Sequence, residues 1–461
     1  MIAKSFLSCG FALAFLTCPA FPQQVRTTIT VDASRSIGLL KHLNDVDNGP
    51  LCEHGVVDLT PYYRQLDIRN VRLHDVDWSY ADVLDIDYVF PDWNADPDRP
   101  ESYHFLASDF YINSLTDLNI NLIFRIGYSA HGKSPSPNLL PPGSFEKWAN
   151  VAAHIVRHYN QGWANGPHAN IRYWEIWNEP DNAEFWTGTP EQYFRLYELT
   201  AKAVKSVDNS LLVGGPALAG HQAFLEDFLN YAHQHSVPVD FVSWHTYAQN
   251  PADVAAHALK IRDTTDRLGF PHAQSILDEW NYGPDDWKPL FKDVASTRKY
   301  FSDMNGATGA AFDAAVLIAL QDAHVDIATF YTGTTAVWGL FTPSGTPHKS
   351  FFAFLAFTDL LKSPNRLALT STDASIYLAA GISDDQKIVR VLVSNPTAEP
   401  KHLHLSFRNL PWKGGTLLKT RCIDSSSDFL ETGNATSVQP EFEQQVPAHT
   451  VLLLTITHAE K

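Results

Sequence analysis

An α/β fold, a (β/α)8 barrel of the TIM type with an accessory C-terminal β-sandwich, is predicted by three features of the 461-residue sequence. Strand-like and helix-like patterns alternate through residues 37–364 and provide eight strand segments. From residue 365 the helical patterns largely stop, and short strands alternate with turn signals, which is typical of a β-sandwich. The β-branched segment RTTITVDA at residues 26–33 precedes the barrel, so we expect this N-terminal strand to join the β-sandwich.

The sequence divides into four parts along the chain. A signal peptide is expected at residues 1–24, because Lys4 precedes an apolar stretch and Ala20 offers a small residue near a cleavage point. The other parts are the N-terminal strand at residues 25–36, the barrel at residues 37–364 and the β-sandwich at residues 365–461. We therefore expect a secreted or periplasmic protein, with a membrane anchor or a lipid-modified Cys18 as the alternative.

The barrel strands are expected where short apolar or β-branched runs end in polar residues or turn signals. These strands are predicted at residues 39–44, 70–74, 121–127, 173–177, 211–214, 240–247, 275–279 and 327–332. Helices are expected at residues 59–67, 105–118, 145–159, 190–207, 222–235, 251–268, 308–323 and 350–361. Strands of the β-sandwich are expected at residues 375–380, 387–394, 402–407, 417–422 and 450–455. The long connection at residues 76–103 is rich in Asp, Pro and Trp, and a barrel loop of this length is usually functional.

Composition excludes several classes of function. The formal net charge of −17 argues against nucleic acid, since a phosphate backbone requires a basic face, and it makes an anionic polysaccharide a less favourable substrate. The 12 Trp and 17 Tyr supply aromatic faces that can stack on sugar rings, although most of them are expected in the core. The four Cys show no metal-ligand spacing, so no metal or other cofactor is expected, and pairing of Cys52 with Cys422 is left open.

Two predicted strands end in a glutamate at the rim of the barrel. Pro180 cannot extend a strand, so Asn178 and Glu179 must lie at the end of the segment YWEIWNEP. Glu279 ends a second apolar run, SILDEWNYG. Two carboxylates that converge from two strand ends are the minimum apparatus for cleaving a glycosidic bond, because one donates a proton and the other attacks or activates water.

Each glutamate has a competitor in the sequence. Glu175 is the competitor of Glu179: it is predicted on the same face of the strand but deeper in the barrel, away from the rim. Asp278, which directly precedes Glu279, is the competitor of that residue. A structural role, such as capping the following helix, is the alternative for either glutamate.

Other polar residues at the predicted strand ends form a candidate site, because the strand C-terminal ends carry the site in a TIM barrel. They are Arg72, His74, Arg125, Asn178, His245, Tyr247 and Tyr331. Arg72 and Tyr247 can hold a carboxylate ionised, and Asn178 can bond the hydroxyl beside the reacting carbon. Taken singly, histidines such as His74 and His245 are more often core histidines than ligands, and Arg72 could simply bridge strands.

The motifs resemble glycoside hydrolase family 39, which includes β-xylosidases and α-L-iduronidases. The resemblance rests on Val71-Arg72-Leu73-His74, Trp174 to Pro180, Trp244-His245-Thr246-Tyr247 and Asp278-Glu279-Trp280-Asn281, in that order. It implies that Glu179 is the acid/base and Glu279 the nucleophile. It also implies that His74, Asn178, His245 and Tyr247 contact the released sugar.

One segment departs from the family pattern, on the eighth strand. Tyr331 stands where the β-xylosidases of the family have a tryptophan, and no Glu or Asp follows in residues 332–338. The identity of the sugar therefore stays open.

The predicted function is a retaining glycoside hydrolase that acts by double displacement on plant-type or bacterial oligosaccharides or polysaccharides. An exo-acting, β-xylosidase-like enzyme is expected. The alternatives are an endo-acting polysaccharide hydrolase, another exo-glycosidase such as an α-L-arabinosidase or β-galactosidase, and a non-catalytic carbohydrate-binding protein. No nucleic-acid partner and no stable membrane insertion are expected, and the sequence does not indicate the oligomeric state.

Overall fold

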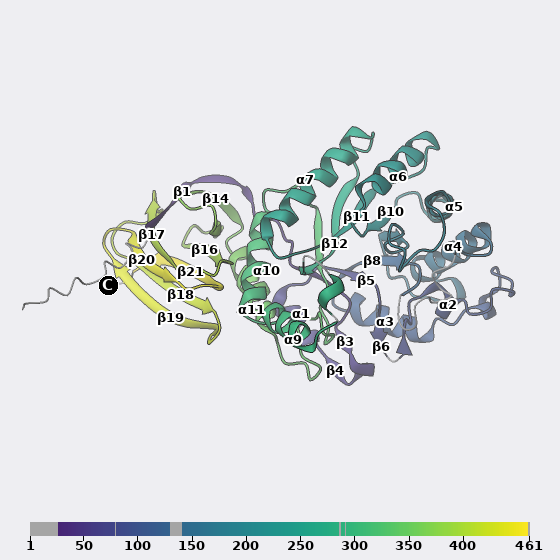
Figure 1. Cartoon of the computed structure of the whole chain (residues 1–461), viewed down its shortest axis with the longest axis horizontal. Helices are drawn as coiled ribbons and strands as arrows, with labels where there is room; N and C mark the ends of the chain where they lie inside the picture. Colours follow the sequence, from purple (N-terminus) through teal and green to yellow (C-terminus); the bar gives the residue numbers. More distant parts are fainter. Residues whose placement is uncertain (1–25, 79, 130–140, 285–286, 291, 460–461) are drawn as a thin grey trace, which may run out of the picture.

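The computed structural model describes residues 26–78, 80–129, 141–284, 287–290 and 292–459. The predicted signal peptide lies outside the described residues. A closed barrel and a separate sheet lie side by side along the long axis of the molecule (Figure 1). Within the described ranges, every helix is too short or too polar to cross a bilayer.

Eight parallel strands close the barrel, so the predicted fold class is confirmed. In chain order they are β2 (Asp45–Asp47), β5 (Asn70–Leu73), β8 (Asn121–Ile126), β9 (Tyr173–Ile176), β10 (Leu212–Leu218), β11 (Phe241–Ala248), β12 (Gln274–Tyr282) and β13 (Ile327–Phe330). Each strand pairs with its neighbours in the chain order of the eight, and β13 closes the ring against β2. The C-terminal ends of all eight strands therefore meet at one rim.

The first barrel strand is β2, and its prediction at residues 39–44 was wrong. The backbone N–H of Leu40 donates to Pro364, and that of Lys41 donates to the side chain of Gln321 at 2.7 Å. The Asn44 side chain donates to Leu66 and to Thr358. These partners lie outside the barrel sheet, so the apolar residues of this segment connect the two parts of the molecule instead of forming a ladder.

Helices surround the barrel as a TIM fold requires. The main ones are α1 (Thr60–Leu66), α3 (Leu106–Thr116), α4 (Phe145–Gln161), α5 (Pro190–Val207), α6 (Gln222–Gln234), α7 (Pro251–Arg267), α9 (Val294–Met304), α10 (Ala307–Ala319) and α11 (Lys349–Leu361), with the short helices α2 (Ile86–Val89) and α8 (Trp287–Leu290). Most coincide with the prediction within a few residues, whereas α2, α8 and α9 were not predicted.

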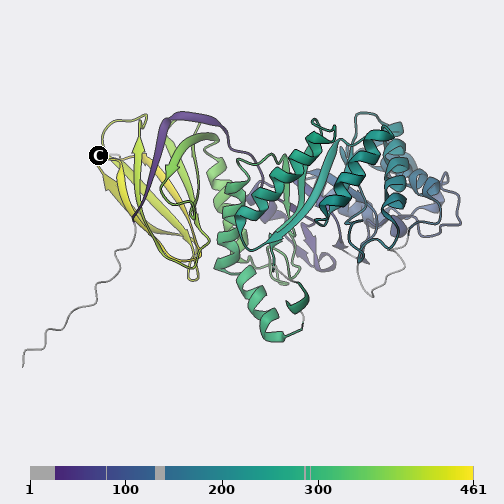
Figure 2. The same ribbon diagram turned by 45° about the horizontal axis from the view of Figure 1, so that its top comes forward.

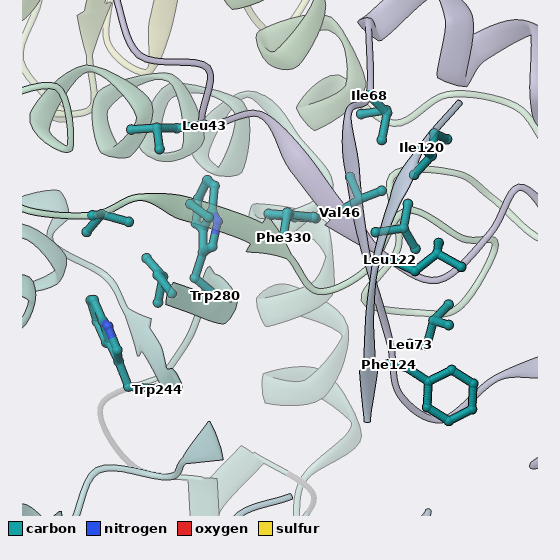
Figure 3. Close-up of a cluster of buried hydrophobic side chains, with 14 of the residues drawn as sticks. Leu43, Val46, Ile68, Leu73, Ile120, Leu122, Phe124, Trp244, Trp280 and Phe330 are labelled. Atoms are coloured by element: carbon teal, nitrogen blue, oxygen red, sulfur yellow. The ribbon is translucent and has the colours of Figure 1, made fainter. Parts of the chain in front are cut away.

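The main core lies between the strands and these helices. On β12, for example, the Trp280 ring packs edge-on against Phe330 and stacks on Phe354 of α11. Figure 3 shows side chains of this core, including Trp244, Trp280 and Phe330.

Inside the barrel a second, smaller apolar cluster forms the floor below the site. Its buried members are Ile123, Tyr173, Phe241, Ile276 and Ile327. Side chains two residues apart on a strand share a face. Glu175 therefore stands one step above Tyr173, and Asp278 stands one step above Ile276. The polar residues of the barrel interior thus begin directly above an apolar layer.

The second part of the molecule is a nine-stranded, mostly antiparallel sheet that contains the N-terminal strand, as predicted. In sheet order its strands are β19 (Asp428–Ser437), β18 (Thr416–Ile423), β21 (Thr450–His458), β16 (Ile388–Asn395), β15 (Tyr377–Ile382), β14 (Asn365–Ser371), β1 (Arg26–Leu39), β17 (Lys401–Arg408) and β20 (Glu441–Val446). Both views show β1 lying beside the C-terminal strands (Figures 1 and 2). Side chains from β1, β17 and β20 share one core with those from β18 and β21, so the sheet curls over on itself.

Helices α10 and α11 lie between the barrel and this sheet (Figure 1). Small residues on α10 allow close approach, and the hydroxyl of Ser394 on β16 donates to the Ala311 carbonyl at 2.6 Å. Arg421 of β18 bonds Asp359 of α11 at 2.7 Å. Cys52, near the rim of the barrel, and Cys422, in the sheet, are both buried and are not joined by a disulfide.

Candidate active site

Glu179 and Glu279 reach the same space at the C-terminal rim of the barrel. Each has a carboxylate oxygen that lies within 4.8 Å of the other's and of a ring nitrogen of His245. His245 Nδ1 lies 2.7 Å from Glu179 Oε1 and 3.5 Å from Glu279 Oε2. The two side chains keep about a tenth of their surface exposed, 12% for Glu179 and 10% for Glu279. They are therefore accessible to a ligand at the rim, unlike the fully buried acids below them.

The chain around Glu179 leaves the strand by a tight turn. β9 ends at Ile176, and both Trp177 (φ +71°) and Glu179 (φ +45°) adopt the left-handed backbone region. That region is unfavourable for a tryptophan or a glutamate and is often found at functional sites. The Glu179 N–H donates to the Ala217 carbonyl at the end of β10, and Asn182 donates to Glu179 Oε2 at 2.9 Å. These contacts fix the carboxylate at the rim.

Arg72 on β5 lies at the centre of the polar layer and is completely buried. Its guanidinium donates to Glu279 Oε2 at 3.2 Å and to Asn178 Oδ1 at 2.7 Å. Its other contacts are with Glu175 (2.8 Å), Asp278 (3.0 Å) and Asp47 (3.2 Å). Four acids of the barrel interior are thus tied to one cation.

The pKa values of the acids in this layer are shifted in opposite directions. Burial raises the pKa of Glu175 to about 8, against the opposing effect of Arg72. Burial also raises the pKa of Asp47 well above its ordinary value. The pKa of Asp278 is lowered, because Arg72 and His245 outweigh the effect of burial. The surroundings therefore favour the protonated forms of Glu175 and Asp47 and the ionised form of Asp278.

Glu279 and His245 form a second coupled group. Burial raises the pKa of Glu279, while the positive charges of His245 and Arg72 act against that shift. The pKa of His245 is raised well above its ordinary value, because the negative charges of Glu279 and Asp278 outweigh the cost of burial. His245 therefore carries a positive charge beside the rim carboxylates. Tyr247 on β11 donates its hydroxyl to Glu279 Oε1.

The structure brings together most of the residues that the sequence selected. Six of them contact one another directly or through one partner: Glu179, Glu279, Asn178, His245, Tyr247 and Arg72. His74 and Tyr331 lie at the edge of this group, 6.4 Å apart between ring centroids, and both approach Asp75. Arg125 does not join the group, because its guanidinium donates instead to Asp85 and Ser129.

Sequence reasoning missed three polar residues of the site. Asp47 lies on a strand of only three residues, and the apolar segment before it has the stronger strand pattern. Asn182 and Asp75 lie in connections, where their placement depends on tertiary contacts. Of the three, only Asp75 had a signal in the sequence: it directly follows His74 at the end of a predicted strand, and strand ends carry the site in a TIM barrel.

The long connection at residues 76–103 lies across the C-terminal end of β8. The Asp85 carboxylate accepts hydrogen bonds from Arg125 and from the Ser129 backbone, and burial raises its pKa to about 7. Trp93 stacks on Trp148 of α4 with 6.0 Å between ring centroids. These contacts hold the connection at the rim that carries the glutamates.

The chemistry available to this arrangement is acid–base and nucleophilic. Glu179, His245 and Glu279 have atoms close enough for a metal ion. In the structure these atoms already bond one another and Arg72, since His245 Nδ1 lies 2.7 Å from Glu179 Oε1 and Arg72 donates to Glu279 Oε2. Two carboxylates that keep a small exposed surface at the rim, with a buried cation behind one of them, fit proton donation and nucleophilic attack on a bound substrate.

Comparison with known proteins places these motifs in context. The sequence profile described as glycosyl hydrolases family 39 matches residues 49–399. A β-xylosidase of Geobacillus stearothermophilus is 28% identical over 306 residues, which are 59% of this chain and 59% of that protein. A β-xylosidase of Caldicellulosiruptor saccharolyticus is 39% identical over 165 residues, 33% of this chain and 32% of that protein. The chain therefore spans less than two thirds of either curated relative.

Solved structures resemble the molecule over nearly its whole length. A glucosidase from Croceicoccus marinus has a TM-score of 0.77 and 26% identity, and the match covers 95% of this chain and 100% of that one. A monomeric β-xylosidase from Caulobacter crescentus has a TM-score of 0.73 and 19% identity, with the same coverage. At that identity the second likeness shows the fold alone.

Proposed function

Because the chain belongs to glycosyl hydrolases family 39, we propose that it cleaves glycosidic bonds with retention of configuration. It acts by double displacement on plant-type or bacterial oligosaccharides or polysaccharides. Its action is exo, and its preference is β-xylosidase-like. The family makes it a glycoside hydrolase, so its substrate is a carbohydrate.

In the proposed mechanism the two rim glutamates have separate roles. Glu279 attacks the anomeric carbon while Glu179 protonates the departing oxygen, which gives a glycosyl ester on Glu279. Water that Glu179 deprotonates then releases the sugar. Arg72 and Tyr247 donate to Glu279 and favour its ionised form, and Arg72 orients Asn178 toward the sugar hydroxyl beside the reacting carbon.

The observation that carries this proposal is the spacing of the two carboxylates. Their closest oxygens lie within 4.8 Å of each other. Retaining enzymes place the two carboxyl groups about 5–5.5 Å apart, whereas inverting enzymes leave a gap of about 6.5–9.5 Å for a water molecule. The short gap supports direct attack by Glu279.

The substrate preference rests on the relatives that the chain resembles. Both curated relatives are named β-xylosidases, while the Croceicoccus marinus structure is named a glucosidase, so a hexoside stays a candidate. Exo action is supported by the long connection between β5 and α3, which is held at the rim through Asp85 and Trp93. We also propose that the protein is exported, on the strength of the signal-like residues 1–24.

The proposal is tested with aryl glycosides of β-xylose, α-L-arabinose, β-galactose, β-glucose and α-L-iduronic acid. We expect the highest kcat/KM on the β-xyloside. The configuration of the first-formed sugar, followed by proton NMR before mutarotation, should equal that of the substrate. Release of the opposite anomer would contradict double displacement, and no hydrolysis of any glycoside would favour the non-catalytic alternative.

A further inference from the structure

A small pocket lies beside the catalytic pair and contains two carboxylates that the mechanism does not use. Its volume is about 170 Å³, and its polar lining includes Asn48, Glu53, Asp75, Tyr331 and Thr335. It lies where the loops after β2, β5 and β13 meet at the rim. Tyr331 connects it to the mechanism, because this ring lies among the negative charges of Asp75 and Glu279.

Glu53 enters this pocket from the loop between β3 (Leu51–Cys52) and β4 (Val57–Asp58). The hydroxyl of Thr335, from the loop after β13, donates to Glu53 Oε1 at 2.8 Å. This bond joins two loops that are 282 residues apart in the chain and holds the acid in place. Glu53 thus puts a carboxylate next to the eighth-strand loop, whose own residues 332–338 contain no Glu or Asp.

Asp75 lies on the other side of the pocket, directly after β5. Its Oδ2 is 3.3 Å from His74 Nε2 and accepts a long hydrogen bond, 3.4 Å, from the Tyr331 hydroxyl. Its Oδ1 is buried and accepts no hydrogen bond from the described residues. A buried carboxylate oxygen is unfavourable without a donor, so a ligand hydroxyl at this position would complete its bonding.

The backbone at both acids is constrained. Glu53 (φ +49°) and Asp75 (φ +52°) both adopt the left-handed region. Residues other than glycine adopt that backbone conformation at a cost in free energy, and residues in it concentrate at ligand sites. None of the described residues that line the pocket is lysine or arginine. The nearby Arg72 already donates to the acids of the barrel interior and to Asn178.

We propose that Glu53 and Asp75 are specificity-determining residues that accept hydrogen bonds from hydroxyls of a neutral sugar and exclude a sugar that carries a carboxylate. This inference rests on the proposed function of the neighbouring glutamates. A neutral sugar offers hydroxyl donors to both acids. A uronate would bring a third negative charge into a pocket that has no lysine or arginine in its lining. Repulsion from the two carboxylates would therefore weaken the binding of that substrate.

The test compares the binding of D-xylose and D-glucuronate by isothermal titration calorimetry, which needs no turnover. The variants are Glu53→Gln and Asp75→Asn, and Glu431→Gln on the exposed face of β19 is the matched control. We expect each pocket variant to weaken D-xylose binding about tenfold, the usual effect of losing a hydrogen bond to a charged group. The ratio of the D-glucuronate to the D-xylose dissociation constant should fall by more than about tenfold, because removing a carboxylate also relieves the repulsion of the uronate, while the control keeps wild-type values.

A third variant keeps the proposal testable if either acid variant fails to fold. Thr335→Val leaves both acids in place and only releases Glu53, so it should change the ratio in the same direction by less. Circular dichroism and thermal unfolding report on the fold of each variant. A change in only one of the two acid variants would assign the selection to that carboxylate and remove the other from the proposal.

Failure of this inference can be told apart from failure of the proposed function. An unchanged ratio in both acid variants, or no binding of D-xylose by the wild type, would overturn the pocket assignment even if the enzyme hydrolyses aryl glycosides. Conversely, sugar binding with the expected ratios but no hydrolysis by the wild type would overturn only the catalytic proposal.

Discussion

Arg72 determines how the side chains of the site are oriented. A guanidinium has five N–H donors in a fixed plane, and here they face Glu175, Asp278, Asp47, Glu279 and Asn178. A buried charge is tolerated only when it is paired and hydrogen-bonded. The raised pKa values of Glu175 and Asp47 favour their neutral forms, whereas Arg72 and His245 favour the ionised form of Asp278.

Tyr247→Phe should move the acidic limb of the pH profile. Burial raises the pKa of Glu279, and the Tyr247 hydroxyl opposes this by donating to the ionised carboxylate. In the proposed mechanism Glu279 must lose its proton to attack, so we expect activity to rise as pH passes the pKa of Glu279. Removing the donor raises this pKa further, and the acidic midpoint of kcat/KM should shift upward by about one pH unit.

Tyr300→Phe is the matched control for that shift. The Tyr300 hydroxyl also donates in a partly buried position, at 2.6 Å, but to the Tyr282 carbonyl on the helix side. We expect this variant to keep the wild-type midpoint. If the acidic midpoint of kcat/KM in Tyr247→Phe stays in place or moves to lower pH, ionisation of Glu279 does not determine that midpoint.

At the residue scale, the sequence predicted the side chains that stand at the ends of strongly patterned strands. Glu179 and Glu279 follow apolar runs that end in turn signals, and Arg72 and Tyr247 alternate with apolar neighbours. Asp47 and Glu53 could not be predicted in this way. Both lie on short segments whose positions depend on contacts with β13 and with the loop after it, far away in the chain.

At the scale of elements, helices were easier to predict than weak strands. α5 begins and ends where its pattern predicts, since Thr189 and Gln192 form a capping box around Pro190. The strands β14, β19 and β20 were missed. On β19 all but one of the described side chains at Asp428–Ser437 are at least partly exposed, so the strand lacks the alternation that marks a half-buried strand.

Asp313 on α10 makes the stability of the helix layer depend on pH. Its side chain is buried, and burial raises its pKa to about 8 against the smaller opposing effect of the Ser350 hydroxyl. Between the unfolded value of 3.8 and about 8, the folded state holds a proton that the unfolded state has lost. The free energy of unfolding therefore falls as pH rises through that range.

Asp313→Asn should remove this dependence. Relative to wild type, the variant should gain more than about 1 kcal/mol in unfolding free energy between about pH 5 and about pH 9, measured by urea denaturation. Asp263→Asn on the exposed face of α7 is the control and should not change the slope. Parallel curves for wild type and Asp313→Asn would show that Asp313 is ionised in the folded protein.

At the scale of the whole molecule, the two parts are joined at both ends of the barrel segment. β1 enters from the curled sheet, and β14 returns to pair with it directly after α11. The sequence predicted that the N-terminal strand joins the C-terminal strands, because its β-branched pattern precedes the barrel alternation. It could not predict which helices face the sheet. That choice depends on the small residues of α10 and on single bonds such as Ser394 to Ala311.

The central claim is that Glu279 forms a covalent bond to the sugar while Glu179 serves as acid and base. The direct measurement is intact-protein and peptide mass spectrometry after incubation with an activated aryl glycoside whose leaving group needs no proton. Glu179→Ala should accumulate a glycosyl adduct on the peptide that contains Glu279, because hydrolysis of the ester lacks its base. Glu279→Ala should accumulate none. An adduct on any other residue, or equal labelling of the two variants, would contradict the account.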